Sequence, residues 1–357
     1  GFVLPVALDL ATFVAVAPAS DGNLHIHSED RQESAHWPVS EIAGLTPRRH
    51  WTDYPIGVAQ ELIRAGFPIA PANLLIRSTV PEGSGLSSSA ALEVSSALAL
   101  LGERRPPPLD LARLCQTAER NFVGMPCGIM DQYISVFGEE NAAICLDCRS
   151  LKHQVVRLPQ GAALIAVNTM VKHELASSAY RERTEQCAAA VEVVRRRHAQ
   201  VASLRDVTPA MYEESEAAMP PVVARRARHV VSEDARVLQF VAACREGALE
   251  RMGELFEASH RSLQHDYEVS CDELDFLVDT ALGIEGVYGG RMTGGGFGGC
   301  TVNLMRPDVV ASFMREIGQA YTARFGLQPS IYECRPAWGA GEVKNPEKIP
   351  AAGQLHG

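Results

Sequence analysis

The sequence lacks several features that define other classes of protein. Basic residues are outnumbered, with 33 Lys and Arg against 43 Asp and Glu and a net charge of −10. This balance argues against nucleic acid or an anionic membrane as the main partner. Long hydrophobic runs are also missing, because the apolar stretches at 7–16 and 142–146 are too short to span a bilayer. Nine scattered cysteines form no disulfide framework, and an odd count of this kind indicates a reducing, cytosolic setting.

Common metal and phosphate motifs are missing too. Cys145 and Cys148 form a CxxC pair, but no second pair with that spacing follows, so we interpret it as a strand with its end turn rather than a zinc site. The glycine-bearing segment 81–90 has no Lys after its second glycine, which excludes the P-loop pattern. Ser88 stands where a Rossmann loop would have its third glycine.

What the sequence does have is an unusual loop, Pro-Glu-Gly-Ser-Gly-Leu-Ser-Ser-Ser-Ala at 81–90. Residues 73–80 before it read as a strand, and the apolar run 90–101 after it reads as a helix. Gly83 and Gly85 let the backbone approach a ligand closely. A strand, a Gly/Ser loop and a helix N-terminus together bind anions, most often phosphate. A plain capped turn is the alternative that the pattern leaves open.

A second glycine cluster lies at 291–300, with five glycines among residues 294–299. Ordering so many glycines is costly, and a fold tolerates it where backbone passes close to backbone or ligand. A tight turn or a bulge is the other interpretation.

The remaining periodicity predicts an α+β protein without internal repeats. Segment 124–132 contains Gly and Pro and is predicted to be non-helical. The other predicted elements are strands within 2–28, 142–168, 287–292, 300–304 and 330–334, and helices at 51–66, 110–122, 181–197, 211–215, 223–245, 252–260, 272–282 and 309–325.

Both glycine motifs, Pro81–Ala90 and Met292–Cys300, resemble those of the kinase superfamily that includes galactokinase, homoserine kinase and mevalonate kinase. The chain is most similar to the galactokinases, and the likeness covers nearly its whole length in the right order. The further segments that resemble galactokinases are 124–132, 146–150, 175–180, 227–231 and 266–271.

The resemblance implies a two-lobed GHMP-kinase fold with the active site between the lobes. Residues 1–160 would form an N-terminal lobe like domain 2 of ribosomal protein S5, which binds nucleotide and sugar. Residues 161–342 would form a ferredoxin-like C-terminal lobe, and 343–357 a loose tail.

It also implies a reaction: transfer of the γ-phosphate of ATP to the anomeric hydroxyl of α-D-galactose, with Mg²⁺, by a cytoplasmic monomer. A kinase for N-acetylgalactosamine or L-arabinose is one alternative. A sensor that binds ATP and galactose without turnover is another, but such sensors lose two residues of a Ser-Ser-Ser-Ala-Ala run that is intact at 87–91.

One departure from the family pattern is large. Galactokinases carry Gly-Arg-Val-Asn-Leu-Ile-Gly-Glu-His-x-Asp-Tyr just before a Gly-Phe-Val-Leu-Pro stretch, and this chain begins at that stretch. We therefore expect a truncated form that lacks the phosphate-steadying Arg and the sugar-holding Glu, His and Asp. An inert fragment is the third reading that this leaves open.

The resemblance assigns roles to residues of this chain. Asp131 matches the catalytic aspartate, as general base or as orienting charge, although its pattern alone also suits a turn-capping residue. Ser89 and Glu119 match the Mg²⁺ ligands, whereas periodicity alone makes Glu119 a solvated helix residue. The positions that match ATP-binding residues are Trp51, Gly83, Ser84, Gly85, Leu86, Ser87, Ser88 and Ser89.

Other matches concern the sugar and the loop packing. Gly128, Asp131 and Tyr180 match sugar-contacting positions. Lys172 stands where a cation would keep Asp131 ionised. A core position is the other reading of Trp51. The glycines at 294–296 are expected to pack on the phosphate loop rather than to bind a ligand.

Overall fold

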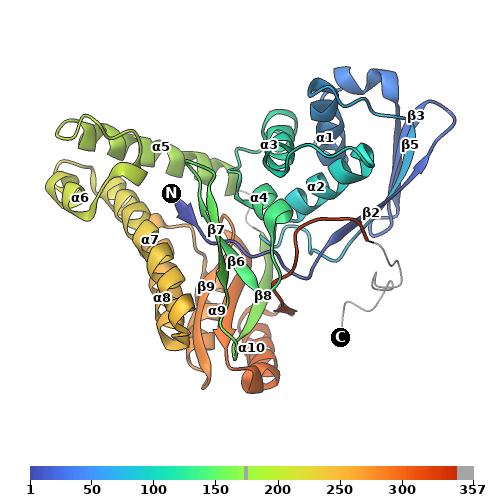
Figure 1. The fold of residues 1–357 in the computed structure, drawn as a ribbon. Coiled ribbons are helices and arrows are strands. Elements are labelled where there is room, and N and C mark those ends of the chain that lie inside the picture. Colours follow the sequence, from blue (N-terminus) through green and yellow to red (C-terminus); the bar gives the residue numbers. More distant parts are fainter. Residues whose placement is uncertain (173–175, 344–357) are drawn as a thin grey trace. The chain divides into compact units, whose positions relative to one another are not determined.

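The structure is a computed structural model that describes residues 1–172 and 176–343, and it divides into two compact units. Of the described residues, the N-terminal unit comprises 7–81, 87–140 and 337–343. The C-terminal unit comprises 1–6, 82–86 and 141–336. Each unit contains both helices and strands (Figure 1), which confirms the α+β class.

The predicted domain boundary near residue 160 stays a prediction. In the structure, the two compact units meet in the sequence between Glu140, which belongs to the N-terminal unit, and Asn141, which belongs to the C-terminal unit. The reason is local pairing: β6 (Ala142–Asp147) pairs with β1 (Phe2–Val3) and with β7 (His153–Arg157) in one antiparallel sheet. Both β1 and β7 also pack on helix α7 of the C-terminal unit.

The N-terminal unit is built on one four-stranded sheet in the order β2-β5-β3-β4. Buried and exposed residues alternate along β3 and β5, as expected for strands with one face on a core. Leu24, Ile26 and Leu74 on that face pack with helix residues in one core. The strands are β2 (Thr12–Pro18), β3 (Asn23–Ser28), β4 (Glu33–Pro38) and β5 (Ala72–Ser78).

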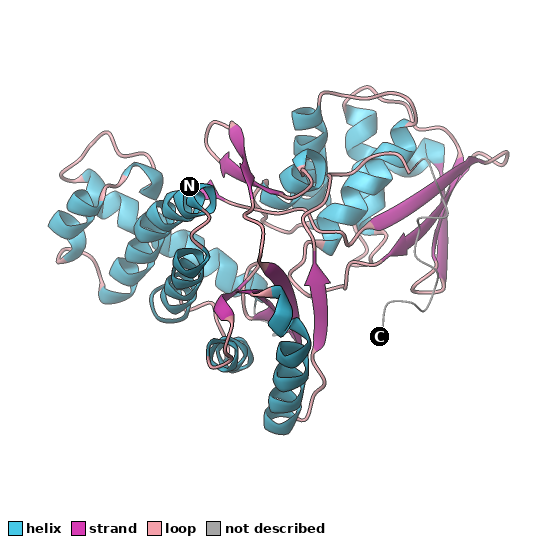
Figure 2. Ribbon diagram, turned by 60° about the horizontal axis from the view of Figure 1, so that its bottom comes forward, coloured by secondary structure: helices cyan, strands magenta, loops and turns pink. Residues whose placement is uncertain are grey.

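Helices cover one face of this sheet (Figure 2). The opposite face leaves Val16 and Leu75 exposed. A 3₁₀ helix follows β4 at Val39–Gly44, and the α-helices are α1 (Asp53–Arg64), α2 (Ser88–Leu101), α3 (Pro108–Ala118) and α4 (Met130–Phe137).

The C-terminal unit contains an antiparallel sheet in the order β11-β8-β10-β9. Numbered by their sequence within this sheet, the strands lie in the order 4-1-3-2, which is the ferredoxin-like arrangement that the resemblance implied. Its strands are β8 (Ala163–Lys172), β9 (Val287–Met292), β10 (Gly298–Met305) and β11 (Ser330–Cys334).

A set of helices is inserted between β8 and β9, and one more joins β10 to β11 (Figure 1). Helix α8 packs on β9, and α9 packs on β9 and β10. The helices are α5 (Ala176–Arg195), α6 (Pro209–Glu216), α7 (Pro221–Glu246), α8 (Leu249–Ser262), α9 (Asp272–Leu282) and α10 (Val310–Phe325), with 3₁₀ turns at Leu204–Asp206 and Pro307–Val309. Among the described residues, no helix combines the length and the apolar character that crossing a bilayer requires.

Two details differ from the sequence-based prediction. Helix α3 does not end as an ordinary α-helix but continues as a π-helical turn, Glu119–Val123, that stops at Gly124. The segment 124–129 is irregular as predicted, but α4 begins at Met130, so Asp131 lies in a first helical turn and not in a loop. Gly124 ends the π turn, and Pro126 and Gly128 lie in the irregular segment before α4. These residues interrupt the helical structure but do not prevent a new helix from starting at Met130. The predicted tail lies outside the described residues beyond Val343.

Candidate functional site

Three helical elements of the N-terminal unit bring acidic side chains together. Glu93 comes from α2, Glu119 from the start of the π turn after α3, and Asp131 and Gln132 from the first turn of α4. Glu93 and Gln132 are completely buried and Glu119 nearly so. We call Glu93, Glu119, Asp131 and Gln132 the acidic cluster.

Gln132 connects the two glutamates. Its side-chain amide nitrogen donates to Glu93 Oε2 at 2.9 Å and to Glu119 Oε2 at 2.6 Å. Within the described part of the chain, Glu93 Oε1 and Gln132 Oε1 are buried without a hydrogen-bond partner. Buried polar atoms are normally paired, and exceptions point to strain, a missing ligand or a functional role.

The electrostatics follow from this crowding. Burial raises the pKa of Glu93 well above its usual range, and the nearby carboxylates of Glu119 and Asp131 raise it further, against a hydrogen bond from Gln132. Burial also raises the pKa of Asp131; a hydrogen bond from Ser87 opposes this effect and Glu119 adds to it. Buried carboxyl groups whose pKa is raised in this way are typical of functional sites.

Two further groups border the cluster. Burial raises the pKa of Tyr54 to about 12, with Glu119 and Glu93 adding to the effect. Burial likewise raises the pKa of Cys127, whose thiol also hydrogen-bonds to Glu119. Both side chains are therefore neutral near pH 7 and add no charge to the acidic cluster.

The predicted phosphate loop has the backbone that its sequence requires. Gly83, Gly85 and Ser87 have φ of 67°, 76° and 61°, values that glycine adopts freely and serine rarely. Ser87 is the residue before α2, and its side chain makes no capping hydrogen bond to that helix N-terminus. The Ser87 hydroxyl instead bonds to Asp131. A cap by the Ser87 side chain is therefore not part of this loop, and the N-terminus of α2 stays the predicted anion site.

The loop residues divide between the two units. Glu82–Leu86 group with the C-terminal unit, whereas Ser87, Ser88 and Ser89 group with the N-terminal unit. Ser84 is buried, its hydroxyl accepts from the Leu86 amide at 3.3 Å, and it also bonds to Cys300. Ser88 and Ser89 are partly buried in the first turn of α2.

The second glycine cluster packs on this loop, as predicted. A Cβ on Gly294 would lie 3.1 Å from the Gly85 carbonyl oxygen, and one on Gly299 would lie 2.7 Å from the Ser84 carbonyl oxygen. Gly296 makes a different contact, against the carbonyl of Val269. The close backbone approach, rather than a ligand, explains glycine at 294 and 299.

Trp51 lies just before α1 and is partly buried against the core of the N-terminal unit. Its indole nitrogen donates to Glu33 Oε2 at 2.6 Å, and the Arg31 guanidinium lies 5.9 Å from its ring centroid. Both predicted roles remain compatible with this position.

Two of the three predicted sugar-contacting residues, Gly128 and Tyr180, are exposed, whereas Asp131 is partly buried. Gly128 lies in the irregular segment before α4, and a Cβ there would meet open space. Tyr180 lies in the first turns of α5 and is 45% exposed. Tyr180 belongs to the C-terminal unit and Gly128 to the N-terminal unit. The side chain of Lys172 lies outside the described part of the structure.

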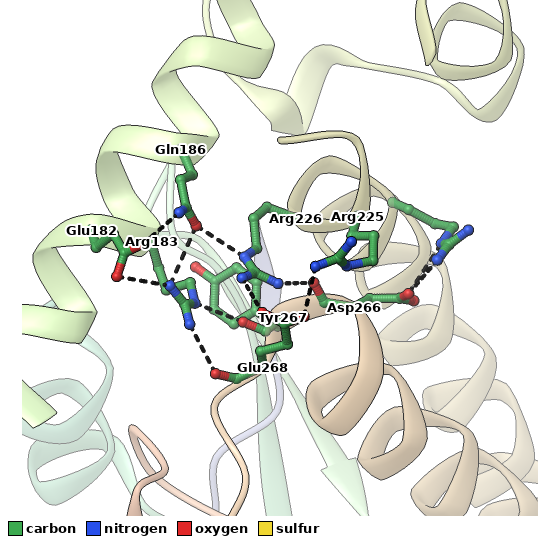
Figure 3. A network of polar contacts seen from close by, with 9 residues as sticks. Glu182, Arg183, Gln186, Arg225, Arg226, Asp266, Tyr267 and Glu268 are labelled. Atoms are coloured by element: carbon green, nitrogen blue, oxygen red, sulfur yellow. Dashed lines mark hydrogen bonds and ion pairs between the residues drawn. The ribbon is translucent and has the colours of Figure 1, made fainter. Parts of the chain in front are cut away.

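A second, partly buried polar cluster lies in the C-terminal unit (Figure 3). Arg226 donates from its three nitrogens to Gln186 Oε1, the Asp266 carbonyl and Glu268 Oε2 at 2.9, 2.6 and 2.5 Å. Arg183, three residues after Tyr180 on α5, donates to the carbonyls of Tyr267 and Glu268. We call Arg183, Gln186, Arg225, Arg226, Asp266, Tyr267 and Glu268 the arginine network.

Sequence reasoning missed Glu93 and Gln132. A signal for Glu93 was present, because it is the one charged residue in the otherwise apolar and small-residue stretch 88–101. It also follows Ser89 by four residues, which places both on one face of α2. Gln132 carried no such signal, since its role depends on contacts with other elements.

The residues present fit a magnesium ion. Glu119 and Ser89 offer oxygen atoms that could bind Mg²⁺. The buried Glu93 Oε1, which has no hydrogen-bond partner among the described residues, is a third candidate ligand. No group of three or more His, Cys, Asp or Glu side chains among the described residues is arranged to hold a metal by itself. An ion here would thus take few protein ligands, which is the usual situation for Mg²⁺ bound with nucleotide phosphates.

Comparison with known proteins gives a consistent result. Residues 53–139 match the GHMP kinases N terminal domain, and residues 240–323 match GHMP kinases C terminal. The chain is 41% identical to a galactokinase of Roseiflexus sp. over 96% of this chain and 88% of that protein. It is 42% identical to a galactokinase of Chloroflexus aggregans over 93% of this chain and 86% of the other.

Solved structures agree. The structure of Lactococcus lactis galactokinase complexed with galactose matches with a TM-score of 0.91 at 32% identity, covering 96% of this chain and 90% of that one. A mevalonate kinase matches with a TM-score of 0.64 at 16% identity, which shows a shared fold. The paired glycine motifs, the acidic cluster and these matches together show that the chain belongs to the galactokinase family of the GHMP kinases.

Proposed function

We propose that this chain transfers the γ-phosphoryl group of ATP to the anomeric hydroxyl of galactose, giving galactose 1-phosphate. The observation that carries the proposal is the hydrogen bond from Ser87 to Asp131. It joins the start of α2, the helix that would hold the phosphates, to the candidate base within one unit. A phosphate held at the helix N-terminus and a hydroxyl held by Asp131 would then be neighbours, as phosphoryl transfer requires.

Each group has a chemical task. The amide groups of Gly83–Ser89 and the dipole of α2 would hold the phosphates. Asp131 would accept the proton of the sugar hydroxyl or orient that hydroxyl. Its raised pKa makes the carboxylate a stronger base than an exposed aspartate. Gly128 and Tyr180 would contact the sugar, and Trp51 the nucleotide base.

Ser89 and Glu119 would hold the magnesium ion. When bound, Mg²⁺ neutralises charge on the β- and γ-phosphate oxygens. Glu119 is suited to hold it because its carboxylate is buried and fixed by Gln132.

We also propose a cytoplasmic monomer. All nine cysteines lie within the described residues and are free thiols, which supports a reducing compartment. Light scattering of the purified chain measures its oligomeric state directly.

The direct test is a panel of sugars with ATP and Mg²⁺. We expect ADP release with galactose and a product whose phosphate is on the anomeric carbon. Faster turnover of N-acetylgalactosamine or L-arabinose would replace the proposed sugar. Binding of ATP and galactose by calorimetry without any ADP release would identify a sensor instead of an enzyme.

A further inference from the structure

We propose that Gln132 is a positioning residue: its one amide nitrogen fixes the carboxylates of Glu119 and Glu93 and so presents Glu119 to magnesium. This inference rests on the proposed function, because it assigns the support of the same metal site.

The geometry restricts Glu119 strongly. A side-chain amide has two N–H groups, and Gln132 donates to two different carboxylates, at 2.6 Å to Glu119 and at 2.9 Å to Glu93. Hydrogen bonds to charged acceptors are the stronger kind. Rotation of the buried Glu119 carboxylate would therefore break a short hydrogen bond.

The bridge also offsets repulsion. Two carboxylates in one buried site disfavour each other's charge, and a neutral donor between them stabilises both without adding a competing cation. A Lys or Arg in this place would pair with Glu119 and compete with Mg²⁺. Glutamine provides two donors and no charge, which suits a carboxylate that must remain available to a metal.

The position of Gln132 in the chain couples the support of the proposed metal ligand Glu119 to the candidate base Asp131. It directly follows Asp131 in the first turn of α4. A movement of α4 would therefore displace the candidate base and the support of Glu119 together. The same turn thus sets the geometry of both functional groups.

The acidic cluster is also incomplete in a specific way. Of the atoms that the structure describes, Glu93 Oε1 and Gln132 Oε1 are buried acceptors without partners. An unpaired buried acceptor costs free energy unless a donor or a cation completes it. Oxygen acceptors are what Mg²⁺ and its bound water prefer.

The test uses Gln132→Leu, which keeps a similar volume and removes both donors. Gln60→Leu is a matched control, because Gln60 is also buried in the N-terminal unit but donates to the backbone carbonyls of Ile42 and Leu45. ATP binding is measured by calorimetry across a Mg²⁺ series, without sugar, and thermal unfolding is followed for each variant.

Loss of a supporting partner typically lowers metal affinity about 10- to 100-fold. We expect a shift of that size in the Mg²⁺ dependence for Gln132→Leu and less than about twofold for Gln60→Leu, although both lose thermal stability. Equal Mg²⁺ dependence in the two variants would overturn the proposal. In steady-state assays, the apparent KM for Mg²⁺ should rise more than kcat falls.

A second pair of variants keeps the test decisive if Gln132→Leu fails to fold. Glu93→Gln retains an acceptor for the Gln132 amide, whereas Glu93→Leu does not. The proposal expects the Mg²⁺ dependence to shift less in Glu93→Gln than in Glu93→Leu, and the reverse order would contradict it. Because these measurements contain no sugar, a wrong sugar assignment leaves them unaffected, and failure of the two proposals can be told apart.

Discussion

Each unit contains one helix that ends in a π turn, and the two turns have opposite polar surroundings. In the N-terminal unit the turn Glu119–Val123 ends at Gly124, and in the C-terminal unit the turn Leu263–Tyr267 ends at Glu268. Both terminal residues are left-handed, with φ of 85° and 53°. Each turn is closed by a bond of 3.1 Å to its first carbonyl, from Met125 and Val269 respectively.

The two turns differ in which groups form hydrogen bonds with their polar atoms. Around Glu268, guanidinium groups from α5 and α7 bond to the carbonyls and the carboxylate that end the turn (Figure 3). Around Glu119, one amide serves two carboxylates, and two buried oxygens have no partner among the described residues. Acceptors that protein side chains pair are suited to structure, although Arg225 Nε in the arginine network is itself buried without a partner among the described residues. A cluster left open is suited to a ligand.

The largest expected effect concerns the open cluster. Asp131→Asn removes the basic oxygen and the negative charge while nearly keeping the volume. General-base catalysis is worth about 10²- to 10⁴-fold, so kcat should fall by that much while ATP still binds. Steady-state kinetics measure the first quantity and calorimetry the second. A loss below about threefold would leave Asp131 a structural residue.

The next effect concerns the arginine network. Arg226→Met removes a guanidinium whose side chain is only 2% exposed and leaves Glu268 and two other acceptors without it. We expect about 3 kcal/mol less stability in urea unfolding, the lower end for a broken buried pair, because Glu268 itself is 44% exposed.

Arg225→Met is the matched control for that prediction. Arg225 bonds to the same Glu268 carboxylate, but its side chain is 34% exposed. An exposed pair contributes under about 1 kcal/mol. Equal losses in the two variants would show that burial does not distinguish them and would weaken the structural role of the network.

The pH dependence of stability tests the same region. Burial lowers the pKa of His229 to about 4; Glu233 and Asp266 oppose the effect, and Arg236 and Arg291 add to it. The unfolded chain takes up a proton at this histidine near pH 6.5, whereas the folded chain does so only near pH 4. Its contribution to stability is therefore complete above pH 6.5 and is lost as the pH falls toward 4.

Between pH 7 and pH 5 this contribution should fall by about 2 kcal/mol. Urea unfolding of the wild type and of His229→Gln at both pH values isolates it, because other titrating groups cancel in the difference. If the two proteins lose stability in parallel, His229 is not the group responsible.

The smallest expected effect returns to the open cluster. Ser89→Ala and Glu119→Gln should each raise the Mg²⁺ concentration needed for half-maximal turnover, by about tenfold or more, with little change in thermal stability. Turnover measured across a Mg²⁺ series checks this. Wild-type behaviour of both variants at low Mg²⁺ would remove these residues from the metal site and leave the open cluster without its expected ligand.

Local sequence was sufficient for most elements. The strand before the phosphate loop and the helix after it were predicted within two or three residues of β5 and α2, because period-2 and period-3.6 patterns report burial directly. The start of α4 was missed, since the Gly and Pro at 124–128 suppressed the expectation of a helix through Asp131. The π turn at Glu119 was missed too, because no sequence pattern distinguishes it from an α-helix end.

By itself, therefore, the sequence determined the glycine loops, the α+β class, the family and the candidate roles of Asp131 and Glu119, all of which depend on residues near one another in the chain. Only the tertiary structure decided that Gln132 meets both Glu93 and Glu119, which lie 39 and 13 residues away. It also decided that guanidinium groups pair the acceptors around Glu268, whereas two buried oxygens of the acidic cluster have no partner among the described residues. Hydrogen bonds across such separations depend on how helices pack, and packing is a property of the whole core rather than of any local pattern.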